Sequence, residues 1–281
     1  MELSIIILNY NTKELTLACL KSIKKFPYNN GLFEVIVVDN NSQDGSWEEF
    51  KAIKNKIQNK NLKLKLIRNK ENYGFAKGNN IGIKKAKGKH ILLLNSDTEV
   101  TKNALNKLVD FAKKNAEAGV VAPRLLNPNG TIQPSVFRLP TLTRSFAQYV
   151  LKRRNILDKY APEADKPVEI ESAVGAAFLI TPIARKKVGL LDERYFMYFE
   201  DLDYCRRVRR ANLKVYYLPN VFVFHVHGAS GESSSIQLNR LRDSSKIYHG
   251  FLKHFILNLI IRLDQKFTYI CLPKGGKRRK M

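Results

Sequence analysis

The sequence predicts an α/β fold in which helices flank both faces of a mostly parallel sheet. Two observations support this prediction: short runs of Ile, Val and Leu alternate with amphipathic stretches of helical period, and a cluster of polar turn residues follows each apolar run. Strands that alternate with helices form parallel sheets, and ligands bind beyond the carboxyl ends of those strands. We therefore expect the polar clusters to meet at one edge of the sheet and to form a binding site there.

The first part of the chain predicts four strands and four helices. The expected strands are 4–8, 34–39, 62–67 and 90–95, and the expected helices are 12–25, 46–57, 76–86 and 102–114. The polar residues expected at the ligand edge are Asn9, Asn11, Asp39, Asn40, Asn41, Ser42, Asn69, Asn72, Asn95 and Asp97. Neither a GxGxxG motif after the first strand nor a P-loop motif occurs, which argues against a dinucleotide cofactor and against P-loop chemistry.

The regular alternation stops near Gly119, and four prolines interrupt the chain between residues 123 and 140. We therefore expect a boundary there between two halves of one domain. The elements expected beyond it are a short strand, a hairpin around Asn129 and Gly130, a helix at 141–157, a loop with Pro162 and Pro167, a strand at 171–181 and a helix at 200–211.

The formal net charge of the chain is +24, from 49 basic and 25 acidic residues. A charge of this size indicates a polyanionic partner: nucleic acid, an anionic lipid surface or a phosphorylated substrate. A solvated, lysine-rich surface explains any single run of charge equally well. Charge therefore indicates an anionic partner without choosing its class.

The sequence predicts neither a membrane-spanning segment nor an export signal. The apolar stretch at 251–263 is 13 residues long and is interrupted by polar residues, whereas a spanning helix needs about 20. The acidic Glu2 stands where a secretory signal carries positive charge, so we expect the chain in the cytoplasm. The three cysteines form no CxxC pair, which argues against a disulfide framework and a structural zinc site.

Two segments at the expected ligand edge have the chemistry to bind a nucleotide. Asp39 can accept hydrogen bonds from a base imino group or a ribose, although Asp, Asn and Ser are also favoured in turns and caps. The segment 72–82 places glycines and side-chain amides around a helix start, which allows backbone N–H groups to approach a diphosphate. A tight helical packing contact explains the same glycines, but the amides favour ligand binding.

Two further segments carry clustered carboxylates. Asp97 ends the apolar run 92–97, either as a simple turn residue or where a divalent cation bridging two phosphates can be held. Glu200, Asp201 and Asp203 follow an aromatic run, and carboxylates this close repel one another unless a cation or a proton transfer uses them. The alternative is the acidic first turn of a helix, where carboxylates are also favoured.

His225 and His227 occupy alternate positions of a strand-like run, so a regular strand places them on the same side. Histidines in strands are usually structural. The presence of Asp97 and the acidic cluster elsewhere in the chain favours metal ligation by one of them.

These segments, in this order and at this spacing, resemble the family 2 glycosyltransferases of the GT-A fold, especially the bacterial rhamnosyltransferase-like branch. The resemblance covers about residues 4–230, and its motifs are ILNYN, VDNNSQDGS, NYGFAKGNN, LLLNSD and FEDLD. It implies a Rossmann-like, mostly parallel sheet flanked by helices, with a mixed acceptor-side half and a C-terminal helical region. The implied activity is inverting transfer of rhamnose or another hexose from a nucleotide-diphosphate donor to a hydroxyl of a cell-surface glycan or lipid-linked intermediate.

The resemblance also implies roles for the acidic and histidine residues. Asp201 is the implied catalytic base, which takes a proton from the acceptor hydroxyl. Asp97 and His225 are the implied ligands of Mn²⁺ or Mg²⁺ on the donor diphosphate, with His227 as the alternative to His225. The implied supporting acids are Glu200 and Asp203.

The remaining implied residues bind the donor, with Asp39 on the nucleobase or ribose. They are Asn9, Asn11, Asp39, Asn72, Gly74, Lys77, Asn79, Asn95 and Ser96. Asn95 departs from the family pattern, because many members carry the first acid of a DxD motif there. A single carboxylate remains, which implies weak or water-mediated metal binding.

By the same resemblance, the chain divides into three parts. Residues 1–118 form the nucleotide-sugar-binding half, 119–235 the acceptor-binding and catalytic half of the same domain, and 236–281 a basic amphipathic C-terminal helix and tail. This last part resembles an interfacial anchor, which implies a peripheral position on the anionic inner face of the plasma membrane. A helix packed on the catalytic domain is the alternative.

Two other functions compete with this interpretation. A nucleic-acid-binding protein explains the charge and the aromatic residues among basic ones, but it leaves the acidic cluster unexplained, so no nucleic-acid partner is expected. A catalytically inactive sugar-nucleotide-binding scaffold explains Asn95. The retention of Asp97, Asp201 and His225 favours the enzyme.

Overall fold

The computed structural model describes residues 1–226 and 234–271. The first half alternates strands and helices as expected, and every predicted bound lies within two residues of the observed one. Its strands β1, β2, β3 and β4 are mutually parallel, in the order β3-β2-β1-β4. The elements are β1 (Leu3–Asn9), α1 (Lys13–Lys25), β2 (Phe33–Asp39), α2 (Ser46–Ile57), β3 (Leu62–Arg68), α3 (Gly74–Lys85), β4 (His90–Leu94) and α4 (Ala104–Lys114).

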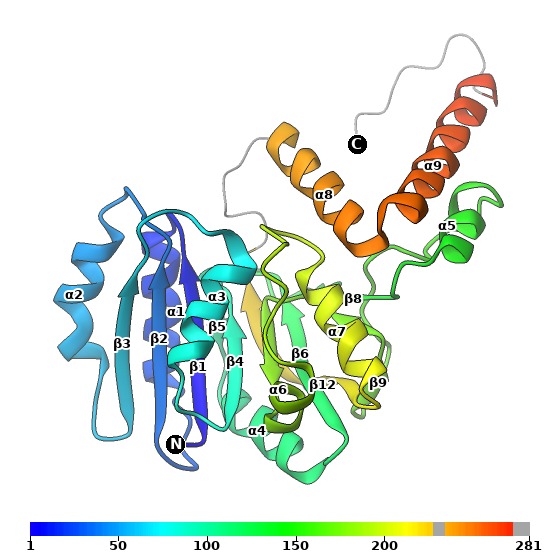
Figure 1. Cartoon of the computed structure of the whole chain (residues 1–281). Coiled ribbons are helices and arrows are strands. Elements are labelled where there is room, and N and C mark those ends of the chain that lie inside the picture. Colours follow the sequence, from blue (N-terminus) through cyan, green and yellow to red (C-terminus); the bar gives the residue numbers. More distant parts are fainter. Residues whose placement is uncertain (227–233, 272–281) are drawn as a thin grey trace.

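The second half extends the same sheet in a mixed pattern, as Figure 1 shows. Its elements are β6 (Ala118–Leu126), β7 (Ile132–Gln133), β8 (Val136–Phe137), α5 (Leu142–Tyr149), β9 (Val168–Ile170), β10 (Ser172–Ala173), β11 (Ala177–Ile180), α6 (Pro182–Val188), α7 (Glu200–Arg210) and β12 (Lys214–His225). The first half also contributes the short strand β5 (Thr98–Val100), which follows β4. β11 runs antiparallel to both β4 and β6 and so joins the two halves. β12 lies parallel to β6 and antiparallel to β5, which brings the end of β12 beside the turn after β4.

Two predicted elements of the second half were wrong in extent. The helix expected at 141–157 is only α5, because Gln148 Oε1 accepts the N–H groups of Ile156 and Leu157 at 3.1 and 2.7 Å and turns the chain back on the helix. The strand expected at 171–181 belongs to a segment of three short strands, β9, β10 and β11. Each pairs with different strands, so the chain bends between them.

The C-terminal helix expected as one element is two helices, α8 (Ser234–His249) and α9 (Phe251–Cys271). Gly250 separates them at φ +74°, a left-handed conformation that ends a helix at little cost for glycine. α8 is anchored to the domain, because Ser244 Oγ donates a hydrogen bond to the Met197 carbonyl at 2.8 Å. Within residues 1–226 and 234–271, no helix has the length and apolarity needed to span a membrane.

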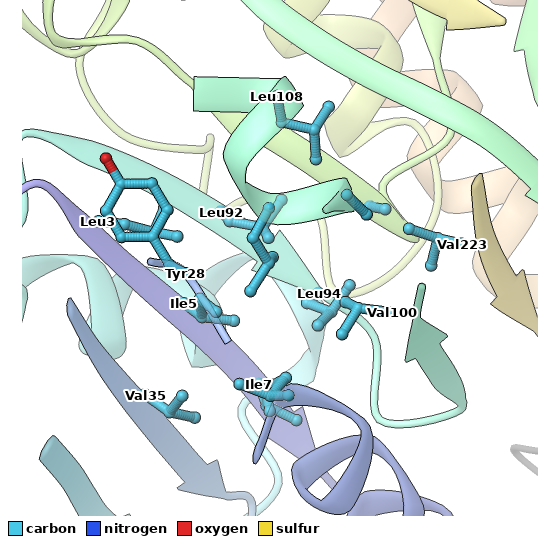
Figure 2. Close-up of a cluster of buried hydrophobic side chains, with 14 of the residues drawn as sticks. Leu3, Ile5, Ile7, Tyr28, Val35, Leu92, Leu94, Val100, Leu108 and Val223 are labelled. Atoms are coloured by element: carbon cyan, nitrogen blue, oxygen red, sulfur yellow. The ribbon is translucent and has the colours of Figure 1, made fainter. Parts of the chain in front are cut away.

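The core consists of two apolar layers, one on each face of the sheet. Because side chains alternate along a strand, Ile5 and Val35 join the layer beneath α1, α2 and α4, while Ile6 and Ile36 join the layer beneath α3 and α7. Figure 2 shows Ile5 and Val35 in the first layer. All four are fully buried, and each such side chain contributes about 1.5–3 kcal/mol. With both faces covered, the polar edge of the sheet is left as the place for a ligand.

The N-terminus of α3 is fixed against the segment that precedes α7. Gly74 has φ +76°, and a Cβ atom there would collide with the Phe196 carbonyl oxygen, which accepts the Phe75 N–H at 2.6 Å. We predict that Gly74→Ala lowers the free energy of unfolding by about 2–4 kcal/mol, because overpacking adds to the left-handed strain. Urea denaturation measures this loss.

Gly45 provides the matched control for this prediction. It has φ +79° but open space around its Cα, so Gly45→Ala carries the backbone strain alone, about 1 kcal/mol. Equal losses in the two variants would show that the contact with Phe196 does not hold α3 in place.

Candidate active site

A cavity of about 1080 Å³ opens at the carboxyl edge of the parallel strands. The turn after β4 contributes residues 95–97, the start of α7 contributes residues 199–202, and α5, α8 and α9 form the outer walls. The cavity therefore lies where the sequence predicted the polar clusters to meet.

Asp97 and His225 come together at the base of this cavity. The antiparallel pairing of β5 with β12 sets His225 opposite Thr98, and the Asp97 carbonyl accepts the Val226 N–H at 2.8 Å. His225 Nε2 then lies 3.4 Å from Asp97 Oδ1. The predicted pair of metal-binding side chains is thus adjacent in space although 128 positions separate them (225 − 97).

Gln133 sets the orientation of the His225 ring. Its Nε2 donates to Asn127 Oδ1 at 2.9 Å, which turns Oε1 toward His225 Nδ1 at 2.6 Å. An amide oxygen only accepts, so the hydrogen-bond network assigns the proton to Nδ1 and directs the basic Nε2 toward Asp97. No sequence pattern marks Gln133 for this role, and it was missed.

Asp97 Oδ1 and His225 Nε2 could serve as two ligands of a cation. A carboxylate oxygen and an imidazole nitrogen face each other, and in the neutral ring that donates from Nδ1 both atoms have a lone pair for a cation. Oxygen with imidazole nitrogen is a ligand set that suits Mn²⁺. In the described part of the chain, no three His, Cys, Asp or Glu side chains gather into a complete site.

Asp201, in the first turn of α7, lines the same cavity. Its Oδ2 accepts the Gly175 N–H at 3.0 Å and its Oδ1 accepts the Leu202 N–H at 2.7 Å. Burial raises the pKa of the Asp201 carboxyl, while these two N–H groups and the Lys159 cation oppose the rise. The carboxylate is therefore held in a fixed orientation and made more basic than an ordinary aspartate.

Glu200, beside Asp201, is 6% exposed, and its Oε2 has no hydrogen-bond partner among the described residues. Burial, followed by the neighbouring Asp201 charge, raises the pKa of Glu200 well above its usual range. Of these two adjacent carboxyls, Asp201 has the N–H donors that favour its charged form, whereas the raised pKa of Glu200 favours its uncharged form.

The backbone just before Glu200 and Asp201 is strained. Tyr198 and Phe199 both have left-handed φ angles, +72° and +69°, which aromatic residues rarely adopt. The Phe199 ring packs against Tyr248 of α8, with ring centroids 5.3 Å apart. Packing of this kind holds strained backbone in place, and such strain is typical of functional sites.

Asp203, the third acid of the cluster, has a different position. It pairs with Arg206 at 2.6 Å and Arg207 at 2.7 Å and is almost fully buried. Arg207 also donates to the carbonyls of Val188 and Leu190, so this network ties α7 to the end of α6. Glu200 and Asp201 therefore line the cavity, whereas Asp203, on another side of the same helix, has a structural role.

The predicted donor-binding residues fall into two groups. Asn72, Gly74, Asn95 and Ser96 line the cavity. The others do not line it: Asn79 is buried and donates to the Phe75 carbonyl at 2.9 Å, and the Lys77 ammonium lies 3.9 Å from the centre of the Tyr73 ring. His227 lies outside the described residues.

Asp39 is fully buried at the end of β2 and does not line the cavity. Its Oδ1 accepts Asn9 Nδ2 at 2.8 Å and its Oδ2 accepts the Ser42 N–H at 3.2 Å. Asn11 joins the same loops, because its Oδ1 accepts the Gln43 N–H at 2.8 Å. These side chains bind together the two loops that follow β1 and β2.

The parallel half, the mixed half and the cavity at their common edge are those of the GT-A glycosyltransferases. The structure of residues 1–349 of S. aureus TarS in complex with UDP-GlcNAc matches 98% of this chain and 75% of that chain, with a TM-score of 0.61 at 18% identity. GalNAc-T7 with UDP, GalNAc and Mn²⁺ matches 98% of this chain and 52% of that chain, with a TM-score of 0.66 at 17% identity. These likenesses establish the GT-A fold.

The family model for glycosyl transferase family 2 matches residues 4–164, and the chain belongs to this family. It is similar to the low-salt glycan biosynthesis hexosyltransferase Agl10 of Haloferax volcanii, with 26% identity over an alignment of 272 residues that covers 91% of this chain and 75% of that protein. The N-acetylglucosaminyl-diphospho-decaprenol L-rhamnosyltransferase of Mycobacterium tuberculosis is 30% identical over 141 residues, 48% of this chain and 46% of that protein. The predictions of family, GT-A fold and nucleotide-sugar-dependent glycosyltransferase are confirmed.

Proposed function

We propose that the chain transfers rhamnose or another hexose, with inversion, from a nucleotide-diphosphate donor to a hydroxyl of a glycan or lipid-linked intermediate. The observation that carries this proposal is that Asp201 and the Asp97–His225 pair line one cavity. A proton acceptor and a cation-binding pair in the same cavity are what a single displacement at an anomeric carbon requires.

Asp201 is the proposed base. With both carboxylate oxygens oriented by N–H groups and the pKa raised by burial, it accepts a proton from an acceptor hydroxyl placed in the cavity. The hydroxyl oxygen attacks the anomeric carbon from the face opposite the departing diphosphate, so the configuration inverts in one step. The raised pKa of Glu200 beside it favours the uncharged carboxyl, which limits the negative charge near the attacking oxygen.

Asp97 and His225 would hold the divalent cation, Mn²⁺ or Mg²⁺, through Oδ1 and Nε2. When bound, the cation supplies Lewis-acid stabilisation of the charge that builds on the leaving diphosphate. Because the described residues supply two protein ligands, oxygens of the donor and of water would complete the coordination, which suits Asn95 in place of a second carboxylate. The Mn²⁺ in the GalNAc-T7 structure supports this assignment.

The proposed donor site uses the polar edge of residues 1–118. Asn72, Gly74, Asn95 and Ser96 are available to the donor in the cavity. Asp39 and Asn9 hold together the loops that border the nucleobase of the donor in this proposal. Because Asp39 is fully buried, its contact with the nucleobase or ribose requires these loops to open. Residues 119–235 then form the acceptor-binding and catalytic half, and 236–281 the C-terminal part.

The proposed location is peripheral, at the cytoplasmic face of the plasma membrane. Phe251, Leu252 and Phe255 at the start of α9 are 87%, 69% and 60% exposed, and Lys253 lies among them. Exposed apolar side chains beside basic ones suit the boundary of an anionic leaflet. The diphospho-decaprenol-linked sugar in the name of the M. tuberculosis relative supports an acceptor at a membrane.

Release of nucleoside diphosphate from UDP-, dTDP- and GDP-sugars tests the proposal, with Mn²⁺ or with EDTA. We expect one donor to be turned over with Mn²⁺, more rapidly when acceptor-containing membranes are present, and the protein to sediment with those membranes. Binding of a donor without release, even with membranes present, would instead indicate the inactive scaffold that Asn95 suggests.

A further inference from the structure

The cavity does not end at the catalytic carboxylates. It continues outward between α5, α8 and α9, where its walls become apolar. Figure 1 shows α8 and α9 as the two arms of a V, with its vertex toward the catalytic domain and α5 beside α9. The apolar side chains of this outer part are Tyr149, Leu157, Leu238, Leu241, Leu257 and Ile261.

The side chains that α8 and α9 contribute to the cavity change in character with distance from Gly250. On α8 the lining residues recur at helical spacing, from Leu238 and Leu241 far from Gly250 to Ser245 and His249 next to it. On α9 the order is reversed, with His254 near Gly250 and Leu257 and Ile261 farther out. The vertex is therefore polar, and the arms combine these apolar side chains with Gln237, Arg242 and Asn258.

Burial lowers the pKa of His249 to about 4, and it also lowers the pKa of His254. Both imidazoles are uncharged at neutral pH. They offer hydrogen bonds at the vertex without adding charge.

Three cations line the same cavity, and none of them forms an ion pair with a carboxylate within residues 1–226 and 234–271, although the charge of Lys159 acts on the nearby Asp201. Arg138 Nη1 donates only to the carbonyls of Asn155 and Ile156, and the Lys159 ammonium lies 5.5 Å from the Phe137 ring centre. Arg242 is exposed on α8. Cations left unpaired in a cavity are available to a phosphate group, and guanidinium groups bind phosphate oxygens in pairs.

We propose that the V between α8 and α9 is the subsite for an amphiphilic acceptor, with its phosphate or diphosphate group held by Arg138, Lys159 and Arg242 and its apolar chain lying between the arms. This inference rests on the proposed function, because it names the class of acceptor that Asp201 deprotonates. The sugar of such an acceptor lies between the phosphate group and Asp201, near which Lys159 is found. A water-soluble glycan would leave the apolar arms without a ligand.

Calorimetric binding of farnesyl diphosphate, below its micellar range, tests the subsite. Farnesol represents the apolar part of the ligand alone, and inorganic diphosphate represents its charged group alone. All titrations contain EDTA, so that no metal–diphosphate complex forms at Asp97. We expect farnesyl diphosphate to bind about tenfold more tightly than either part. Arg242→Gln and, separately, Lys159→Gln should each weaken its binding by about tenfold. Farnesol binding should change little in both variants.

Arg210→Gln is the matched control, because Arg210 is exposed on α7 away from the cavity, and it should bind all three probes as the native protein does. Undiminished binding in both cavity variants would overturn the proposal. Farnesyl diphosphate binding no tighter than inorganic diphosphate would also overturn it and would indicate a water-soluble phosphorylated acceptor. The assay uses neither donor nor metal, so failure of the subsite is distinguishable from failure of glycosyl transfer.

Discussion

Asp201→Asn is expected to reduce the rate of glycosyl transfer by about 10²–10⁴-fold, the usual contribution of a positioned general base. Asparagine keeps the size of the side chain and can still accept the Gly175 N–H, but it cannot accept a proton. Initial rates with the preferred donor and membranes that contain the acceptor measure the loss.

The pH profile supplies a second readout for Asp201. A base works only when ionised, so kcat/KM of the native enzyme should fall as pH drops through the Asp201 pKa. Because burial raises that pKa, the fall should begin at a higher pH than for an ordinary aspartate. The residual activity of Asp201→Asn should lack this acid limb. A variant that keeps its activity within about tenfold, or keeps the limb, would assign the base elsewhere.

Asp203→Asn is the control that separates structure from chemistry. Its carboxylate pairs with Arg206 and Arg207 and does not line the cavity. Loss of the Asp203 charge should lower the melting temperature, because its contacts with both guanidinium groups weaken. The pH profile of the protein that remains folded should retain its acid limb.

Asp97→Asn is expected to have the second large effect. Removal of the carboxylate charge leaves His225 as the remaining member of the pair, so the Mn²⁺ concentration for half-maximal activity should rise and turnover at saturation should fall by about 10²–10³-fold. Electron paramagnetic resonance of free Mn²⁺ measures the affinity independently of turnover. Unchanged Mn²⁺ binding would rule out Asp97 as a ligand.

Gln133→Leu tests the orientation of the histidine without touching the metal. With the Nδ1 acceptor removed, the ring can take the other tautomer, and Mn²⁺ affinity should fall by about 10–100-fold. Asn127 lies one step further out, and its replacement by Ala leaves Gln133 Nε2 with the His225 carbonyl as an acceptor, so this variant should lose much less.

The first half of the fold could be predicted from periodicity because its strands and helices are local and amphipathic. The position of Asp97 after a buried strand was enough to place it at the site. The extent of the strand expected at 171–181 could not be predicted, because the breaks in this segment depend on which strands β9, β10 and β11 pair with. α5 ends earlier than predicted because Gln148 accepts hydrogen bonds from the Ile156 and Leu157 N–H groups.

The candidate site was predictable only where sequence position implies spatial position. Asp201 and His225 were found from their chemistry and the family motif. Lys159 and Arg242 line the cavity, and Gln133 contacts His225, through tertiary structure that no local pattern marks. The Gly175 N–H that holds Asp201 is a backbone group and has no side-chain signal. Because Asp203 is close to Asp201 in the sequence, the two were grouped together. They have different roles because the helix directs Asp201 into the cavity and Asp203 toward Arg206 and Arg207.

The most direct test of the central claim is the position of manganese in crystals grown with Mn²⁺ and the intact preferred donor, using Asp201→Asn to prevent turnover. Anomalous diffraction should place the metal in contact with Asp97 Oδ1 and His225 Nε2, with the donor diphosphate on the metal and the anomeric carbon facing residue 201. Manganese bound away from this pair, or a sugar that faces away from residue 201, would contradict the account.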